Sequence, residues 1–130
     1  MKIVNERPPI YDECAKVFPL TGNEIFCWGD TIYSPGGGKI TRALVAHEAT
    51  HSQQQGTKIQ KWWDSYLADP IFRLEQEIAA HVMEYRKFRD YTFSRKLRDE
   101  YLNGVASRLC SPLYGNLIPH KDAVKIIRGG

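Results

Sequence analysis

Two long segments of the chain repeat apolar residues with the period of an α-helix. The first covers residues 39–55 and is followed by Gly56, a residue type that commonly terminates helices. The second opens at Asp69 and Pro70, where Asp is a favoured N-cap and Pro fits the first helical position, and it extends to about Asp90. The pattern predicts two helices, with a short apolar and helix-compatible region at residues 62–67 between them.

Shorter elements flank these two segments. Residues 24–28 and 31–34 are β-prone runs joined by Gly29 and Asp30, which predicts a β-hairpin. Three further helices are predicted at residues 8–18, at residues 97–109 and after Pro119. The expected fold class is therefore α+β and helix-rich. The hairpin precedes the first long helix, and a glycine-rich loop connects the two.

Composition limits the class of protein. A chain of 130 residues with 42% apolar and 25% charged side chains is expected to form one domain, residues 1–130. No apolar run approaches the roughly 20 residues that cross a bilayer, and the first residues lack an apolar stretch of signal-peptide length, so we expect a cytoplasmic protein with no membrane partner. Cys14, Cys27 and Cys110 form no CxxC pair, which favours reduced thiols.

The first long helix carries the motif H-E-x-x-H at residues 47–51. Residues four apart share one helical face, so the imidazoles of His47 and His51 can reach one ion, and imidazole is a good ligand for Zn²⁺. Glu48 lies about 100° around the helix from His47, where it can take a proton from a metal-bound water as general base. Zinc lowers the pKa of such a water towards about 7. The motif predicts a Zn²⁺ site with two histidine ligands and one catalytic glutamate.

Chance is a poor explanation of this motif. Shuffling four His and eight Glu over 130 positions would give roughly 0.007 matches. The competing interpretation is a helix with two surface or hydrogen-bonded core histidines. Ile40, Ala43 and Leu44 share the histidine face, so the imidazoles project from a half-buried stripe where burial without partners would be costly. We therefore favour the metal site.

The segment from Ala46 to Gln54 resembles the active-site helix of the HExxH zinc metallopeptidases, the zincins. The preceding hairpin is similar to the substrate-side strands that lead into that helix in zincins. The resemblance is specific over residues 46–54 and loose over residues 24–90. It implies a small zincin-like domain that hydrolyses peptide bonds in a peptide or protein substrate.

The resemblance also implies a third zinc ligand and an open position for water. The metzincin subclass takes a further histidine where this chain has Thr57. The gluzincin subclass takes a glutamate from a later helix, with a small residue three positions on, and Glu77 with Ala80 matches that pattern. Glu75 is the poorer alternative, because the bulkier Ile78 follows it at the same spacing.

Other site positions are less specific. His81 stands where gluzincins often carry a carboxylate that orients a ligand histidine, so it is a candidate partner or replacement ligand. Zinc peptidases usually need a donor that stabilises the oxyanion, and Tyr114, in a loop bounded by Pro and Gly, is the first candidate before His120. A substrate strand is expected to pair with the hairpin edge at residues 31–34.

Two other functions stay open at this point. One is a zinc-bearing interaction protein without turnover, since so short a chain leaves little material for a deep cleft. The other is a nucleic-acid adaptor, because residues 86–98 contain six basic side chains interleaved with aromatic residues that could stack on bases. A solvated helix face over an aromatic core explains the same residues, and we rank the adaptor last. Trp62 and Trp63 either line the substrate site or fill the core.

Overall fold

A computed structural model describes residues 1–130 and contains one three-stranded mixed sheet. Its strands are β1 (Lys2–Val4), β2 (Phe26–Trp28) and β3 (Thr31–Tyr33), in the order β1-β3-β2. β2 and β3 pair antiparallel, as the hairpin prediction required, and β1 pairs parallel with β3. Gly29 turns the chain between β2 and β3 at a φ of 62°, which glycine adopts without the steric cost of a side chain.

Six α-helices account for most of the remaining chain. They are α1 (Tyr11–Val17), α2 (Arg42–Gln55), α3 (Ile59–Ala68), α4 (Pro70–Asp90), α5 (Arg95–Leu109) and α6 (His120–Gly129), with a short 3-10 helix η1 (Pro112–Tyr114) before α6. Side-chain caps begin three of them: the oxygens of Thr41, Asp69 and Ser94 accept hydrogen bonds from backbone N–H groups of α2, α4 and α5. The expected helix-rich α+β class is confirmed.

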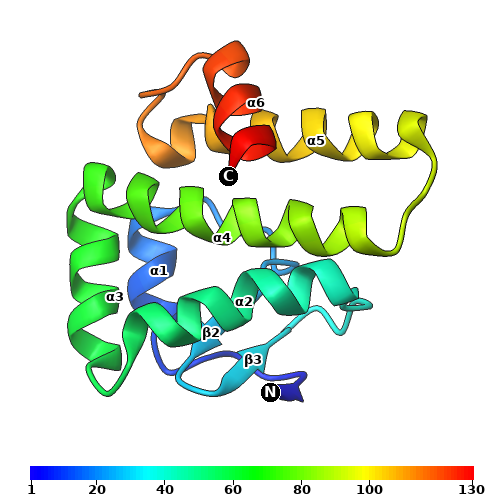
Figure 1. Cartoon of the computed structure of the whole chain (residues 1–130). Helices are drawn as coiled ribbons and strands as arrows, with labels where there is room; N and C mark the ends of the chain where they lie inside the picture. The colour runs from blue at the N-terminus through cyan, green and yellow to red at the C-terminus, as the bar shows by residue number, and fades with distance from the viewer.

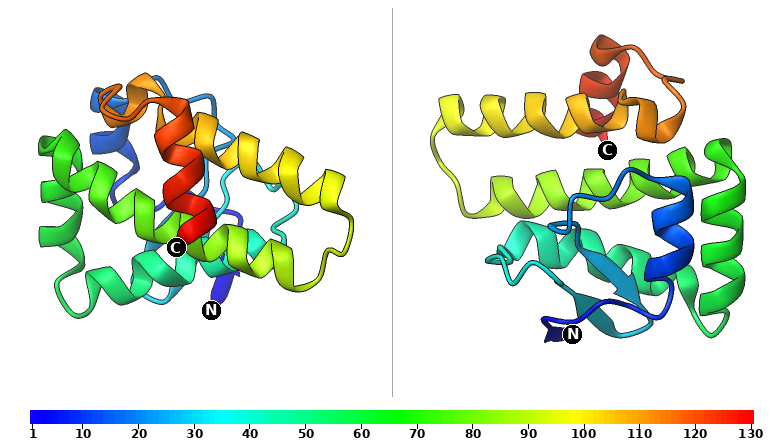
Figure 2. Two further views of the ribbon diagram at one scale, coloured as in Figure 1. Left: turned by 45° about the horizontal axis from the view of Figure 1, so that its top comes forward. Right: turned by 180° about the vertical axis from the view of Figure 1, so that it is seen from behind.

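The elements stack in layers (Figure 1). The sheet, α2, α4 and the pair α5 and α6 follow one another, and each layer packs on the next. α3 links the ends of α2 and α4 at one side, and α1 lies beside α3 on the face that the rear view of Figure 2 brings forward. None of these helices is both long and apolar enough to span a membrane.

Two apolar clusters hold the layers together. The first joins α4, α5 and α6 around buried Leu102, Val105 and Leu109. The second joins α1, β2 and α3 and includes Trp62 and Trp63. Between the two clusters, the facing sides of α2 and α4 are buried but carry charged and polar side chains. That polar interface needs a separate explanation, because unpaired burial of such groups is costly.

The sheet corrects one expectation about substrate binding. β1 pairs with the outer edge of β3, so β3 is the middle strand of the sheet. Just after β3, the N–H of Ser34 donates to the carbonyl of Val4 at 2.8 Å. The prediction that a substrate strand pairs with residues 31–34 is therefore wrong. The free edge next to α2 belongs to β2. β1 was not predicted, because it has three residues and only a nonlocal partner.

Candidate metal centre

The helices α2 and α4 bring together a set of buried polar side chains. On α2 the buried residues include His47, Glu48 and His51, and on α4 they include Glu77, His81 and Glu84. Spacings of three, four and seven residues place such side chains on one helical face. Ala43 on α2 and Ala80 on α4 are fully buried, and their small side chains let the two helices approach closely.

Three of these side chains meet at one point. The Nε2 atoms of His47 and His51 are 3.2 Å apart. Oε1 of Glu77 lies 3.2 Å from the first of these nitrogens and 3.3 Å from the second. The three residues are between 4% and 8% exposed, and separations of 3.2–3.3 Å leave no room for a water molecule between their atoms.

The other ring nitrogens fix the orientation of both histidines. Nδ1–H of His47 donates to Oε1 of Glu84 at 2.8 Å. Nδ1–H of His51 donates to Oε1 of Gln54 at 2.8 Å, while the amide nitrogen of Gln54 donates to the carbonyl of Gln76 at 3.0 Å. Because Nδ1 carries the proton in each neutral ring, each Nε2 presents a lone pair to the common point.

Positive charge is strongly favoured at this point. Burial disfavours the charged form of His47, but the negative carboxylates of Glu77 and Glu84 beside it outweigh this effect and raise the pKa of His47 to about 10. Burial likewise disfavours the charged form of Glu77, yet His51 and His47 hold the pKa of this carboxyl well below its usual range. A proton can bridge only one pair of these atoms at a time, whereas a metal ion can bind all three.

The spacing of the three atoms fits zinc. Nitrogen and oxygen ligands bound at 2.0–2.1 Å to a tetrahedral centre lie about 3.3–3.4 Å apart, close to the separations found here. Oε1 of Glu77 is also a buried oxygen with no hydrogen-bond partner, which is costly unless a cation binds it. His47, His51 and Glu77 can therefore hold a metal ion.

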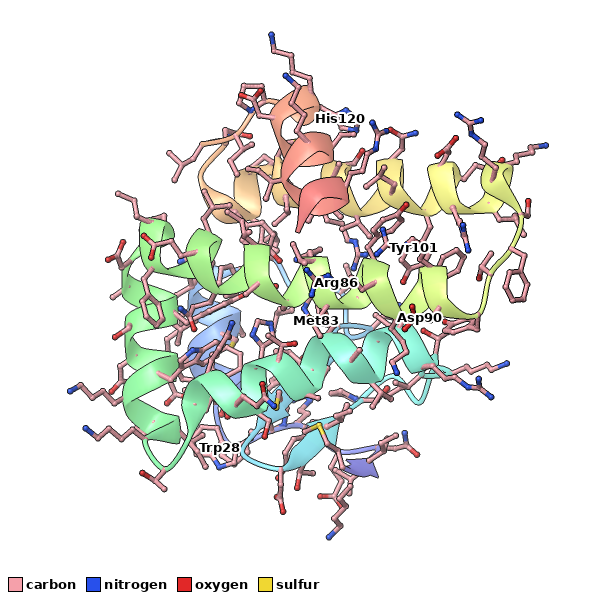
Figure 3. All side chains as sticks on the ribbon, in the orientation of Figure 1. Trp28, Met83, Arg86, Asp90, Tyr101 and His120 are labelled. Carbon is pink, nitrogen blue, oxygen red and sulfur yellow. The ribbon has the colours of Figure 1, made fainter.

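A second group, His47 with His81 and Glu84, is a weaker candidate. Glu84 already accepts hydrogen bonds from His47 and from the hydroxyl of Tyr101, at 2.5 Å, and it pairs with Arg108 at 2.6 Å. Figure 3 shows Tyr101 on α5 beside α4. Nδ1 of His81 donates to the carbonyl of Glu77 at 2.6 Å, and burial lowers the pKa of His81 to about 4. The guanidinium of Arg108 supplies the positive charge that a cation would bring to Glu84.

Glu48 lies beside the three converging atoms and lines a cavity of about 530 Å³. It is 6% exposed, and its Oε2 has no hydrogen-bond partner. Burial raises the pKa of Glu48, although the nearby histidines act in the opposite direction. A carboxylate that is buried, unpaired and open to a cavity has the character of a general base.

Two tyrosines approach the same cavity. The hydroxyl of Tyr66 donates to Oε2 of Glu77 at 2.5 Å. Tyr114 is 6% exposed, lines the cavity, and places its ring centroid 6.1 Å from that of His81. Trp62 and Trp63 belong to the second apolar cluster, as the core interpretation of this pair predicts, and they also line the cavity.

Two of the alternative site residues lie elsewhere. Glu75 is exposed on the outer side of α4, away from the histidines. His120 is exposed at the start of α6, where its Nε2 approaches the carbonyl of Asn103 at 3.4 Å (Figure 3). The structure thus brings Glu77 to the HExxH histidines and Tyr114 to the cavity, and it leaves Glu75 and His120 outside.

The sequence interpretation missed three residues that hold the side chains of His47 and Glu77 in place, directly or through a neighbour: Glu84, Tyr66 and Arg108. Glu84, and not a residue at the position of His81, accepts the hydrogen bond from Nδ1 of His47. The sequence does contain a sign that Glu84 is near the site, because it follows Glu77 by seven residues and therefore shares its helical face. Nothing in the sequence indicated that Tyr66, on another helix, would reach Glu77. Arg108 comes from α5, and its partner could be found only in three dimensions.

Part of the basic stretch at residues 86–98 serves the fold. Nε of Arg86 donates to the carbonyl of Gly130 at 2.7 Å. Arg98 donates to the carbonyls of Arg89, at 3.0 Å, and of Thr92. The exposed members of the stretch are Arg86, Lys87, Arg95 and Lys96, and of these Arg86 is already bound to a backbone carbonyl. The number of basic side chains along the sequence therefore overstates the charge available to a partner.

Comparison of the chain with protein-family models, with curated proteins and with solved structures found no match in any of the three. The His47, His51 and Glu77 cluster is therefore the feature from which function is inferred.

The hydrogen bond from His47 to Glu84 gives a testable prediction. Replacing Glu84 by Gln keeps its shape but removes the charge that orients His47 and pairs with Arg108. We expect zinc affinity to fall about 10- to 100-fold, the usual cost of losing such a partner. Competition with a chromophoric chelator measures this affinity. Glu100→Gln, on the exposed side of α5, is the control and should change nothing. Equal affinity in both variants would contradict the role of Glu84.

Proposed function

We propose that the chain is a small zinc-dependent metallopeptidase of the gluzincin type. One observation carries the proposal: two Nε2 atoms and one carboxylate oxygen, from two helices, converge with the spacing of tetrahedral zinc ligands. The position of Glu48 adds support, because its buried side chain, with one oxygen unpaired, lines the same cavity as His47, His51 and Glu77.

The roles of the residues follow from their positions. His47, His51 and Glu77 would hold zinc, which supplies a Lewis acid that acidifies water and polarises a carbonyl group. Glu48 accepts the proton of the attacking water and transfers it to the leaving amine. Tyr114 donates a hydrogen bond to the carbonyl oxygen as negative charge develops on it.

The residues that line the cavity favour a peptide as the substrate. Residues 23–27 line it and lead into β2, the edge strand, so an extended peptide can pair with this segment. The carbonyl of Cys27 already accepts hydrogen bonds from Gln55, at 2.8 Å, and from Trp63, at 3.1 Å. Pairing is therefore expected upstream of Cys27, along residues 23–25.

Metal analysis followed by a peptide-library digest tests the proposal. The purified chain should take up stoichiometric zinc and cleave library peptides, a chelator should stop cleavage, and added zinc should restore it. A chain that stays empty when supplied with zinc would refute the metal site. A chain that binds zinc but cleaves nothing would instead be a zinc-bearing interaction protein.

A further inference from the structure

The two oxygens of Glu77 have different surroundings. Oε1 faces the Nε2 atoms of His47 and His51 and has no hydrogen-bond donor of its own. Oε2 accepts the hydroxyl hydrogen of Tyr66 at 2.5 Å. One oxygen is thus left for a cation, and the other is already bound within the protein.

The position of Tyr66 is strongly constrained. Its ring stacks on Trp62, with centroids 4.9 Å apart and an interplanar angle of 25°, and meets the edge of Trp63 at 5.1 Å. Nε of Arg73 donates to the backbone carbonyl of Tyr66 at 2.8 Å, and the side chain is buried. These contacts hold the hydroxyl in place, so the hydrogen bond to Glu77 does not depend on a mobile side chain.

A carboxylate can bind a cation through one oxygen or through both. If Glu77 bound through both, its second oxygen would take a coordination place that a catalytic zinc keeps for water. Cations such as Ca²⁺ and Mn²⁺ favour oxygen-rich coordination with more ligands. A hydrogen-bond donor held at Oε2 disfavours binding of a cation through both oxygens of Glu77. It therefore also disfavours the cations that prefer this two-oxygen mode.

We propose that Tyr66 is a positioning residue that restricts Glu77 to one-oxygen binding and so keeps a coordination place open for water. The inference rests on the metal site proposed above. Tyr66 lines the cavity, but its hydroxyl is bound to Oε2 of Glu77, and in this scheme it acts on the cation only through that oxygen.

Cobalt substitution gives a readout that is independent of activity. Four-coordinate Co²⁺ absorbs visible light much more strongly than Co²⁺ with five or six ligands. We expect the native chain to give the strong spectrum and Tyr66→Phe to give a weaker one. We also expect the ratio of Zn²⁺ to Mn²⁺ affinity to fall about 10- to 100-fold in the variant. Tyr85→Phe is the matched control, because Tyr85 is a buried tyrosine of α4 that does not line the cavity.

The outcomes separate this inference from the metal site itself. A native chain that takes up neither Co²⁺ nor Zn²⁺ would refute the site. A cobalt-loaded Tyr66→Phe chain with the native spectrum and native metal preference would refute the role of Tyr66. If the variant does not fold, a crystal structure of the zinc-loaded native chain decides. In that structure we expect Oε2 of Glu77 still to accept the hydrogen bond from Tyr66. Both oxygens of Glu77 within about 2.2 Å of zinc would overturn the inference.

Discussion

Replacing Glu48 by Gln is expected to lower peptide hydrolysis about 10²- to 10⁴-fold, the usual contribution of a positioned general base. Zinc content should stay at the native level, because Glu48 lies beside the converging ligand atoms and is not one of them. Gln has the shape of Glu but cannot accept the proton of water at neutral pH. Rates on the best library peptide, measured beside zinc content, test both statements.

Glu75→Gln provides the control for this experiment. It makes the same chemical change at an exposed position of α4, and both rate and zinc content should be native. Unchanged hydrolysis in Glu48→Gln would remove Glu48 from its role. Lost zinc in that variant would mean that the buried carboxylate acts in metal binding.

Local signals in the sequence were sufficient for the main helices. The apolar period, together with Gly56 after α2 and Asp69 before α4, predicted both central helices, and α4 begins and ends where expected. α2 begins at Arg42 and not at residue 39, because Thr41 caps it with its side-chain oxygen. Capping and periodicity act within a few residues, which is why they can be identified without a structure.

Nonlocal pairing was the part that the sequence could not supply. β1 has three residues and no distinctive alternation, and it becomes a strand only because β3 is present to accept it. That single pairing covers the outer edge of β3 and leaves β2 as the only hairpin strand with a free edge. The predicted substrate edge failed for this reason, although the hairpin itself was predicted correctly.

The candidate site likewise has one part that local sequence could predict and another part that depends on contacts between distant segments. His47, Glu48 and His51 share one helix, so their spacing alone indicated a common ion. The choice of Glu77 over Glu75 depended on the resemblance to gluzincins, in which a small residue, here Ala80, follows the glutamate by three positions. Gln54, which orients His51, lies on the same helix, but the other orienting residues come from α3, α4 and α5, and only the fold brings them to the site.

Replacing Glu77 by Ala is expected to abolish stoichiometric zinc binding, whereas Glu75→Ala should leave it unchanged. The reason is geometric, because Oε1 of Glu77 lies 3.2 and 3.3 Å from the two histidine nitrogens while Glu75 faces solvent. Bound zinc stabilises the folded chain by about 2.7 kcal/mol when its concentration is 100 times the dissociation constant. For a domain of this size, that corresponds to a rise in Tm on the order of 10 °C.

The zinc-dependent rise in Tm, measured for each variant with and without zinc, separates metal binding from general destabilisation. Glu77→Ala also leaves the hydroxyl of Tyr66 without its acceptor, so its Tm without zinc is expected to change as well. Only the difference between the two conditions reports the ligand role. The native chain and Glu75→Ala should show the full rise and Glu77→Ala almost none. A full rise in Glu77→Ala, or its loss in Glu75→Ala alone, would show that another carboxylate completes the site.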